Sequence, residues 1–227
     1  GTDVADSVLK ALAGEFVADA VNVAGGNAGE EVARWLDLSR KLGLLAGKLL
    51  EEAPVSLKVT ARGELSTEEV NLLGLSAVRG LFSGIVDEPV TFVNAPAIAE
   101  ARGLSYTVET ETEALTHRSA LEVQAVGAEG QTATVTGALT SLEGVEKIVR
   151  INGRGVDMRA EGRNLFFRYT DVPGALGKVG SQLGAHDINI DAAALTRTTK
   201  GDGAVLILRV DKEVPEQLEE QIAQSID

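Results

Sequence analysis

The last third of the chain carries a succession of hydrophobic patterns that restricts the fold more than any other feature. Residues 165–169 are predicted to form a strand, and Asp-Val-Pro-Gly at 171–174 opens a helix with a predicted buried stripe of Leu176, Val179 and Leu183. Strands at 188–196 and 204–210 and a helix at 214–226 follow. The order β-α-β-β-α is that of a ferredoxin-like unit without its final strand, so we expect a fold one element short of it.

The residues before this unit predict an α+β region with a meander of strands and helices beside it. A long helix over 30–52 carries one apolar stripe, formed by Trp35, Leu38, Leu42, Leu45 and Leu49. The other predicted elements are a helix at 3–13, a strand at 55–62, a capping box at Ser66–Glu69 that opens a helix to about Ile85, a helix at 96–101, strands at 104–110, 119–126 and 131–139, and a hairpin of 148–151 with 156–159.

A length of 227 residues suits two domains of ordinary size. The Gly-rich stretch 24–29 breaks all periodicity and is the best linker candidate. We therefore predict a leading segment and linker at 1–29, an α+β domain at 30–160, and the ferredoxin-like βαββα(β) domain at 161–227. The start at Gly1, directly before a helical pattern, suggests a chain cut from a longer one.

Charge and residue usage exclude several classes of function. The net charge of −13 repels nucleic-acid backbones and anionic lipid, so neither is an expected partner. Without cysteine, and with two isolated histidines, a metal site is not expected. No apolar run reaches membrane-spanning length and the N-terminus has no signal-peptide pattern, which favours a soluble, cytoplasmic protein.

No complete catalytic set is present in the sequence. The dinucleotide, P-loop and nucleophile-elbow glycine motifs are absent. Glu109, Glu111 and Glu113 share one face of a strand, where like charges favour a solvated surface over a catalytic pair. We therefore expect no catalytic residues and no cofactor in this chain.

A candidate site for a free amino acid surrounds the start of the helix at 171–174. The N–H groups of the first helical turn suit a carboxylate, and the Asp171 carboxylate suits an ammonium group. Asn189 offers an amide for a hydroxyl or an ammonium, and Gly174 leaves room for a ligand beside the backbone. The alternative is that Asp171 only caps the helix and Asn189 only serves a turn.

The segment NLFFRYTDVPGALGKVGSQLGAHDINI, residues 164–190, resembles an ACT domain, a regulatory unit that binds amino acids between paired copies. Residues 30–160 resemble the intervening, allosteric substrate-binding domain of the long bacterial D-3-phosphoglycerate dehydrogenases, and residues 3–23 resemble the end of their catalytic part. The resemblance covers essentially the whole chain.

The resemblance implies a parent enzyme that oxidises 3-phosphoglycerate with NAD in the first step of serine synthesis and is inhibited by L-serine. Tyr169, Asp171 and Asn189 match the serine-contact positions, at the interface of a homodimer or homotetramer. The catalytic and NAD-binding residues of the family lie upstream of Gly1, so this chain alone is expected to be inactive.

The resemblance also suggests a second site, for phosphate or a phosphorylated substrate, where the two domains meet. Its basic residues would be Lys147, Arg154, Arg159 and Arg209, although Gly155 stands where some relatives have histidine. Solvated strand-edge charges are the other reading of these residues. A free-standing amino-acid-binding module and an assembly element that binds no ligand remain open as alternative functions.

Overall fold

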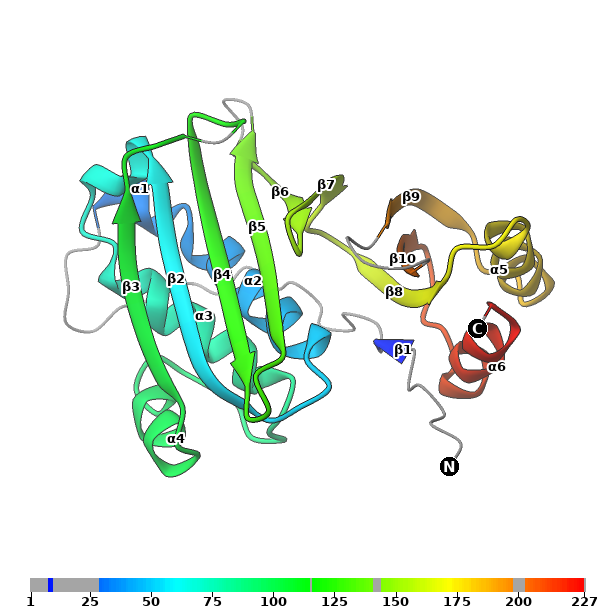
Figure 1. Ribbon diagram of the computed structural model, residues 1–227, viewed down its shortest axis with the longest axis horizontal. Coiled ribbons are helices and arrows are strands. Elements are labelled where there is room, and N and C mark those ends of the chain that lie inside the picture. The colour runs from blue at the N-terminus through cyan, green and yellow to red at the C-terminus, as the bar shows by residue number, and fades with distance from the viewer. Residues whose placement is uncertain (1–7, 10–28, 115, 141–143, 198–202, 227) are drawn as a thin grey trace. The chain divides into compact units, whose positions relative to one another are not determined.

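A computed structural model of the chain describes residues 8–9, 29–114, 116–140, 144–197 and 203–226. The chain divides into two compact units between Gly153 and Arg154 (Figure 1). We call residues 29–153 the central unit and residues 154–226, together with the short strand β1, the C-terminal unit. The fold class is mixed α and β with two domains, as predicted.

The central unit is built on a six-stranded sheet in the order β3-β2-β4-β5-β6-β7. Its last strand in sequence, β7, begins at Arg154, the first residue after the division between the units. Strand β3 pairs with β2 in parallel, and the connection between them runs through two helices. The predicted meander therefore holds for β4, β5 and β6 but is wrong for β3, because β2 lies between β3 and β4. The strands are β2 (Pro54–Gly63), β3 (Ser105–Glu111), β4 (Ser119–Gly127), β5 (Thr132–Thr140), β6 (Val145–Ile151) and β7 (Arg154–Arg159).

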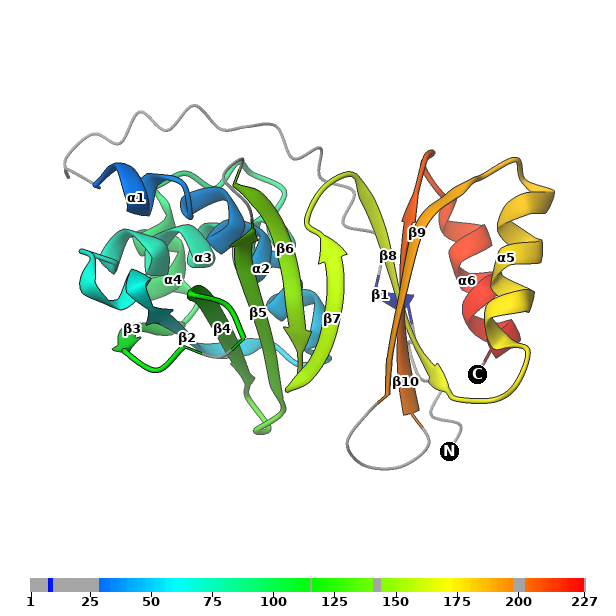
Figure 2. The same cartoon turned by 90° about the horizontal axis from the view of Figure 1, so that it is seen from above.

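The helices of the central unit lie on one face of this sheet (Figure 2). They are α1 (Glu30–Ala33), α2 (Leu36–Leu49), the 3₁₀ helix η1 (Glu64–Thr67), α3 (Asn71–Ser83) and α4 (Ala95–Ala101). All five members of the predicted apolar stripe are at most 2% exposed, which confirms the buried face of the long helix. A turn at Arg34–Trp35 divides that helix into α1 and α2, and α2 ends before the predicted Glu52.

Helices α2 and α3 approach each other through glycine. A methyl group at Gly43 would lie 2.0 Å from the carbonyl oxygen of Ala77, and one at Gly80 would lie 1.7 Å from that of Arg40. The hydroxyl of Ser39 donates to the Leu73 carbonyl at 2.7 Å, and that of Ser76 donates to the Leu36 carbonyl at the same distance.

These contacts are reciprocal because serine, glycine and glycine recur at the same spacing, Ser39-Gly43-Gly47 in α2 and Ser76-Gly80-Gly84 in α3 and its C-cap. Each of the four contacts above has a counterpart in which the two helices exchange roles. The helix pair therefore has an approximate two-fold relation.

The predicted capping box at Ser66–Glu69 does not form. Ser66 lies in η1, and its hydroxyl donates to the Gly63 carbonyl at 2.6 Å, while α3 begins later, at Asn71. A serine hydroxyl that donates to the carbonyl three residues earlier stabilises a local turn, and this serine does not cap a helix. The prediction is wrong at this point because local hydroxyl-to-backbone bonding competed with helix initiation.

The predicted hairpin near Asn152 is present as β6 and β7. Asn152 and Gly153 have φ values of 48° and 77°, as a two-residue turn of type I′ requires at both central positions. Asparagine and glycine tolerate this conformation better than other residues, so the turn follows directly from the sequence.

The C-terminal unit is a sheet in the order β1-β8-β10-β9 with two helices on one face (Figure 2). The elements are β8 (Arg163–Thr170), α5 (Ala175–Ala185), β9 (Ile190–Arg197), β10 (Gly203–Val210) and α6 (Glu216–Ile226), so the predicted βαββα order is confirmed. Val179 and Leu183 are fully buried as predicted. Leu176 is 46% exposed, which contradicts its predicted place in the stripe.

Strand β1 (Val8–Leu9) pairs antiparallel with β8, opposite Phe167 and Phe166. This contradicts the helix predicted at 3–13 for these two residues, which instead pair with the β8 edge that the missing final strand of a ferredoxin-like unit would cover. The rest of that predicted helix, and the predicted linker except Gly29, lie outside the described residues.

Candidate functional site

The connection between β8 and α5 presents an uncapped helix start. Helix α5 begins at Ala175, and its N-cap is Gly174 in the left-handed region, with φ 92° and no side-chain hydrogen bond to the helix. Gly174, and not Asp171, therefore occupies the N-cap position of this helix. A methyl group at Gly174 would meet nothing within 4 Å, so space for a ligand exists beside this backbone.

Tyr169 is almost completely buried. Its side chain is 4% exposed and belongs to the core between the sheet and the two helices, with Ala175 and Val179. It is the second-last residue of β8, two positions before Asp171, so it anchors the end of β8 from inside the domain.

Asn189 is exposed and lies just before β9. Its backbone N–H donates to the Asp211 carboxylate at 2.7 Å, and its backbone oxygen accepts from the Asp211 N–H at 3.1 Å. The side-chain Nδ2 donates to Asp191 at 3.2 Å. The amide oxygen accepts no bond from the residues that the structure describes.

Strand register separates Asn189 from Asp171. Thr170, which precedes Asp171, pairs with Gly203 at the start of β10, whereas Ile190, which follows Asn189, pairs with Val210 at its end. At about 3.3 Å per residue, the two positions lie about 20 Å apart along the strands. One copy of the chain therefore does not bring them together.

Three exposed apolar side chains lie around the Asp171 end of the domain. They are Val172, Leu176 and Leu195, each about 45% exposed, and Leu195 belongs to β9 at the sheet edge. Exposed apolar groups beside an open strand edge are typical of a surface that contacts another protein.

The predicted anion residues are partly brought together. Arg209 and Arg159 both contact Oε1 of Glu161, at 2.9 and 3.5 Å, so these two guanidinium groups share one carboxylate. Arg154 is the first residue of β7 in the same unit, and Lys147 lies on β6 in the central unit.

Comparison with known proteins agrees with this architecture. Residues 31–152 match the D-3-phosphoglycerate dehydrogenase intervening domain. The chain belongs to that family. Residues 163–227 match the ACT domain. From here the central unit is called the intervening domain and the C-terminal unit the ACT domain.

The chain is similar to part of several longer curated relatives. The chain is 55% identical to D-3-phosphoglycerate dehydrogenase of Mycobacterium tuberculosis and 52% identical to that of Mycobacterium leprae, in each case over 100% of this chain and 43% of the relative. That of Methanocaldococcus jannaschii is 29% identical over 98% of the chain and 42% of the relative. The chain thus spans less than half the length of these enzymes.

The predicted boundaries at 29/30 and 160/161 stay predictions. The division of the structure falls at 153/154, and the two family matches end at 152 and begin at 163.

Among the described residues there is no group of three or more His, Cys, Asp or Glu side chains that could hold a metal ion. None of the helices in the described ranges is long and apolar enough to cross a membrane.

Proposed function

We propose that the chain is the regulatory part of a D-3-phosphoglycerate dehydrogenase, in which L-serine binds between two paired ACT domains and inhibits the enzyme. The observation that carries the proposal is the strand register, because Asp171 and Asn189 occupy opposite ends of one ACT sheet. A site that uses both residues requires a second copy.

Antiparallel pairing of two β9 edges supplies the required geometry. Strand β9 runs parallel to β8, since both pair antiparallel with β10. In a two-fold pair the β9 of the second copy runs the other way, so its Asn189 moves to the Asp171 end of the first copy. The exposed Leu195 on β9 would be covered by such pairing.

The chemistry of the two half-sites complements serine. The carboxylate of serine takes the uncapped N–H groups of the first turn of α5, where the helix dipole favours negative charge. The ammonium group pairs with the Asp171 carboxylate, and the hydroxyl forms a hydrogen bond with the Asn189 amide of the second copy. Gly174 keeps the approach open, and Tyr169 holds the end of β8 in place from the core.

Mixing two inactive variants tests the shared site. Asp171→Ala and Asn189→Ala should each weaken L-serine binding by about ten-fold or more in calorimetry, because the first loses the bond to the ammonium group and the second loses the bond to the hydroxyl. In a mixed pair, one of the two sites combines Asp171 of one copy with Asn189 of the other, so refolding the variants together should restore part of the heat. Glu220→Gln, exposed on α6, is the matched control and should bind as wild type.

A lack of restoration, with each variant still able to pair in sedimentation experiments, would contradict a site built from two chains. Wild type that pairs but gives no heat with serine would favour an assembly element instead. Wild type that binds serine without pairing would favour a free-standing amino-acid-binding module.

The catalytic half of the parent enzyme belongs to the same proposal. We assign oxidation of 3-phosphoglycerate with NAD to residues outside this chain, so the chain alone should show no NADH formation at 340 nm, a wavelength set by the cofactor. The relatives' name supports this assignment, since the chain covers 43% of their length.

An anion site for phosphate or a phosphorylated substrate is a second proposal, with Arg154, Arg159 and Arg209 of the ACT domain as its cations. The shared Glu161 supports it, because two arginines on one carboxylate keep positive charge in excess at that point. Arg209→Gln should reduce binding of inorganic phosphate in calorimetry, whereas Arg102→Gln, on an exposed helix end, should not.

A further inference from the structure

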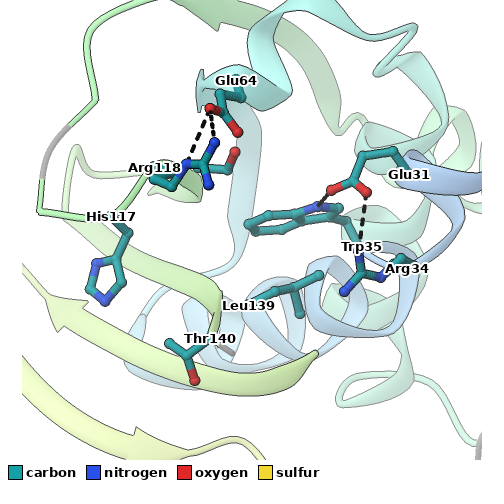
Figure 3. Close-up of a pocket in the computed structure, with 9 residues that line it drawn as sticks. Glu31, Arg34, Trp35, Glu64, His117, Arg118, Leu139 and Thr140 are labelled. Atoms are coloured by element: carbon teal, nitrogen blue, oxygen red, sulfur yellow. Dashed lines mark hydrogen bonds and ion pairs between the residues drawn. The ribbon is translucent and has the colours of Figure 1, made fainter. Parts of the chain in front are cut away.

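A cavity of about 360 Å³ opens in the intervening domain, away from every residue assigned above (Figure 3). Its walls come from five parts of the sequence: the α1–α2 turn, η1, the loop before β4, the start of β4, and the end of β5. The volume is within the range of about 300 to 1,000 Å³ that is usual for small-molecule sites.

Two ion pairs stand on opposite sides of the cavity, as Figure 3 shows. On one side Arg118 donates through Nε and Nη2 to one oxygen of Glu64, at 3.2 and 2.7 Å. On the other side Arg34 donates to Glu31 at 3.2 Å. All four side chains are at least 46% exposed, so solvent screens each pair and either pair exchanges readily with a ligand.

A backbone contact holds the Arg118–Glu64 pair in place, and a side-chain contact holds the Arg34–Glu31 pair. Gly63 adopts φ 68°, and its conformation brings the Arg118 carbonyl to the Glu64 N–H at 3.0 Å. A methyl group at Gly63 would lie 2.0 Å from that carbonyl oxygen. Glu31 also accepts the indole N–H of Trp35 at 3.2 Å, which orients its carboxylate.

The charge balance of the walls selects a dipolar ligand. The two arginines and two glutamates sum to zero, in a protein of net charge −13. An anion that drew Arg34 or Arg118 from its partner would leave a glutamate unpaired, and a cation would leave an arginine unpaired. A ligand with one carboxylate and one ammonium group replaces both partners at once and leaves no charge unpaired.

The remaining walls are of mixed character. Leu139 offers apolar contact beside the Trp35 ring, which is itself 1% exposed, and His117 contributes an imidazole (Figure 3). Ser119 and Thr140 offer hydroxyl groups. We propose that this cavity, formed by the Arg34–Glu31 and Arg118–Glu64 pairs beside Trp35, is a binding site for a free amino acid with an apolar side chain. The site is separate from the ACT domain.

Three probes of one shape test the requirement for two charges. L-Leucine carries both groups, 4-methylpentanoate only the carboxylate, and 3-methylbutylamine only the ammonium. Trp35 is the single tryptophan of the chain, so its emission reports on the cavity directly. L-Leucine should change the emission saturably and release or absorb heat in calorimetry, whereas each single-charge probe should bind at least about ten-fold more weakly.

Variants locate the binding. Arg118→Gln and Glu64→Gln should each weaken L-leucine binding about ten-fold. Both side chains are exposed, and unchanged far-UV circular dichroism would confirm the fold. Asn189→Ala, in the ACT domain, should leave the L-leucine response unchanged and so separates this site from the serine site. Equal binding of 4-methylpentanoate, or neither heat nor an emission change with millimolar L-leucine, would overturn the proposal.

Discussion

Among single residues, Lys41 lies between two carboxylates in the intervening domain, Asp37 on its own helix α2 and Glu146 on strand β6. It is 6% exposed and contacts Asp37, at 2.9 Å, and Glu146. Burial raises the pKa of Glu146, and its hydrogen bond with Lys41 does not offset that effect. Burial also acts to raise the pKa of Asp37, but hydrogen bonds from Lys41 and Arg40 outweigh it, so that pKa is lowered.

The two carboxylates should respond oppositely to pH. Asp37, with a lowered pKa, stabilises the fold above its usual value of 3.8, and this contribution is lost as pH falls through the lower folded value. Asp37→Asn should therefore destabilise the protein at pH 7 and approach wild type in strong acid. Urea unfolding at a series of pH values measures this difference.

Glu146 supplies the matched comparison, because its raised pKa makes its contribution greatest below its usual value of 4.5 and smaller as pH rises through the folded value. Glu146→Gln should thus cost less stability at pH 7 than Asp37→Asn. An equal loss for the two variants at pH 7 would show that Lys41 depends on both carboxylates alike.

The burial or contacts of a residue were predictable from the sequence where they depend on one helix or strand, and not where they depend on how several elements pack. The apolar stripe from Trp35 to Leu49 followed from helical period alone. Leu176 has the same period in its own helix but is exposed, since period does not tell whether another element lies opposite. The Arg118–Glu64 pair joins residues 54 apart in the sequence, and no spacing rule indicates such a contact.

At the scale of elements, the close approach of α2 and α3 decides how the helices cover the sheet. Their backbones meet where a methyl group would overlap a carbonyl oxygen, at Gly43 and Gly80. Helix α5 offers a contrast, because a methyl group at Gly180 would meet nothing within 4 Å.

Substitution by alanine should therefore have opposite signs in the two places. Gly43→Ala and Gly80→Ala should each lower the free energy of unfolding by about 1 to 3 kcal/mol or more, since the helices must separate. Gly180→Ala should raise it by about 0.5 to 1 kcal/mol through helix propensity. Chemical denaturation measures all three, and a stabilised Gly43→Ala would refute the close approach.

The element order was predictable, but strand neighbours were not. Alternation of apolar and polar residues predicted β2, β3, β4 and β5, the turn at Asn152-Gly153 predicted β6 and β7, and apolar runs predicted β8, β9 and β10. The parallel pairing of β3 with β2 depends on how α3 and α4 cross over the sheet, which no local pattern encodes. The repeated Ser-x₃-Gly-x₃-Gly spacing of α2 and α3 was a readable signal of helix packing that period analysis passed over.

For the whole molecule, two separate cores predict separate responses to core substitution. Leu42 is fully buried in the intervening domain and Leu183 in the ACT domain. Each leucine-to-alanine change should cost about 2 to 5 kcal/mol, but only in its own domain. Differential scanning calorimetry should show two transitions, with Leu42→Ala lowering one and Leu183→Ala the other. A single transition lowered by both variants would show that the domains unfold as one.

The two-fold relation between α2 and α3 has a consequence for how this sequence can change over time. Positions 37 residues apart, such as Gly43 with Gly80 and Ser39 with Ser76, perform the same task on facing surfaces. A larger residue at one of these positions increases the distance between the two helices, so the counterpart position no longer requires a small residue. Across an alignment of related sequences, substitutions at these positions should arise as couples, offset by that fixed interval.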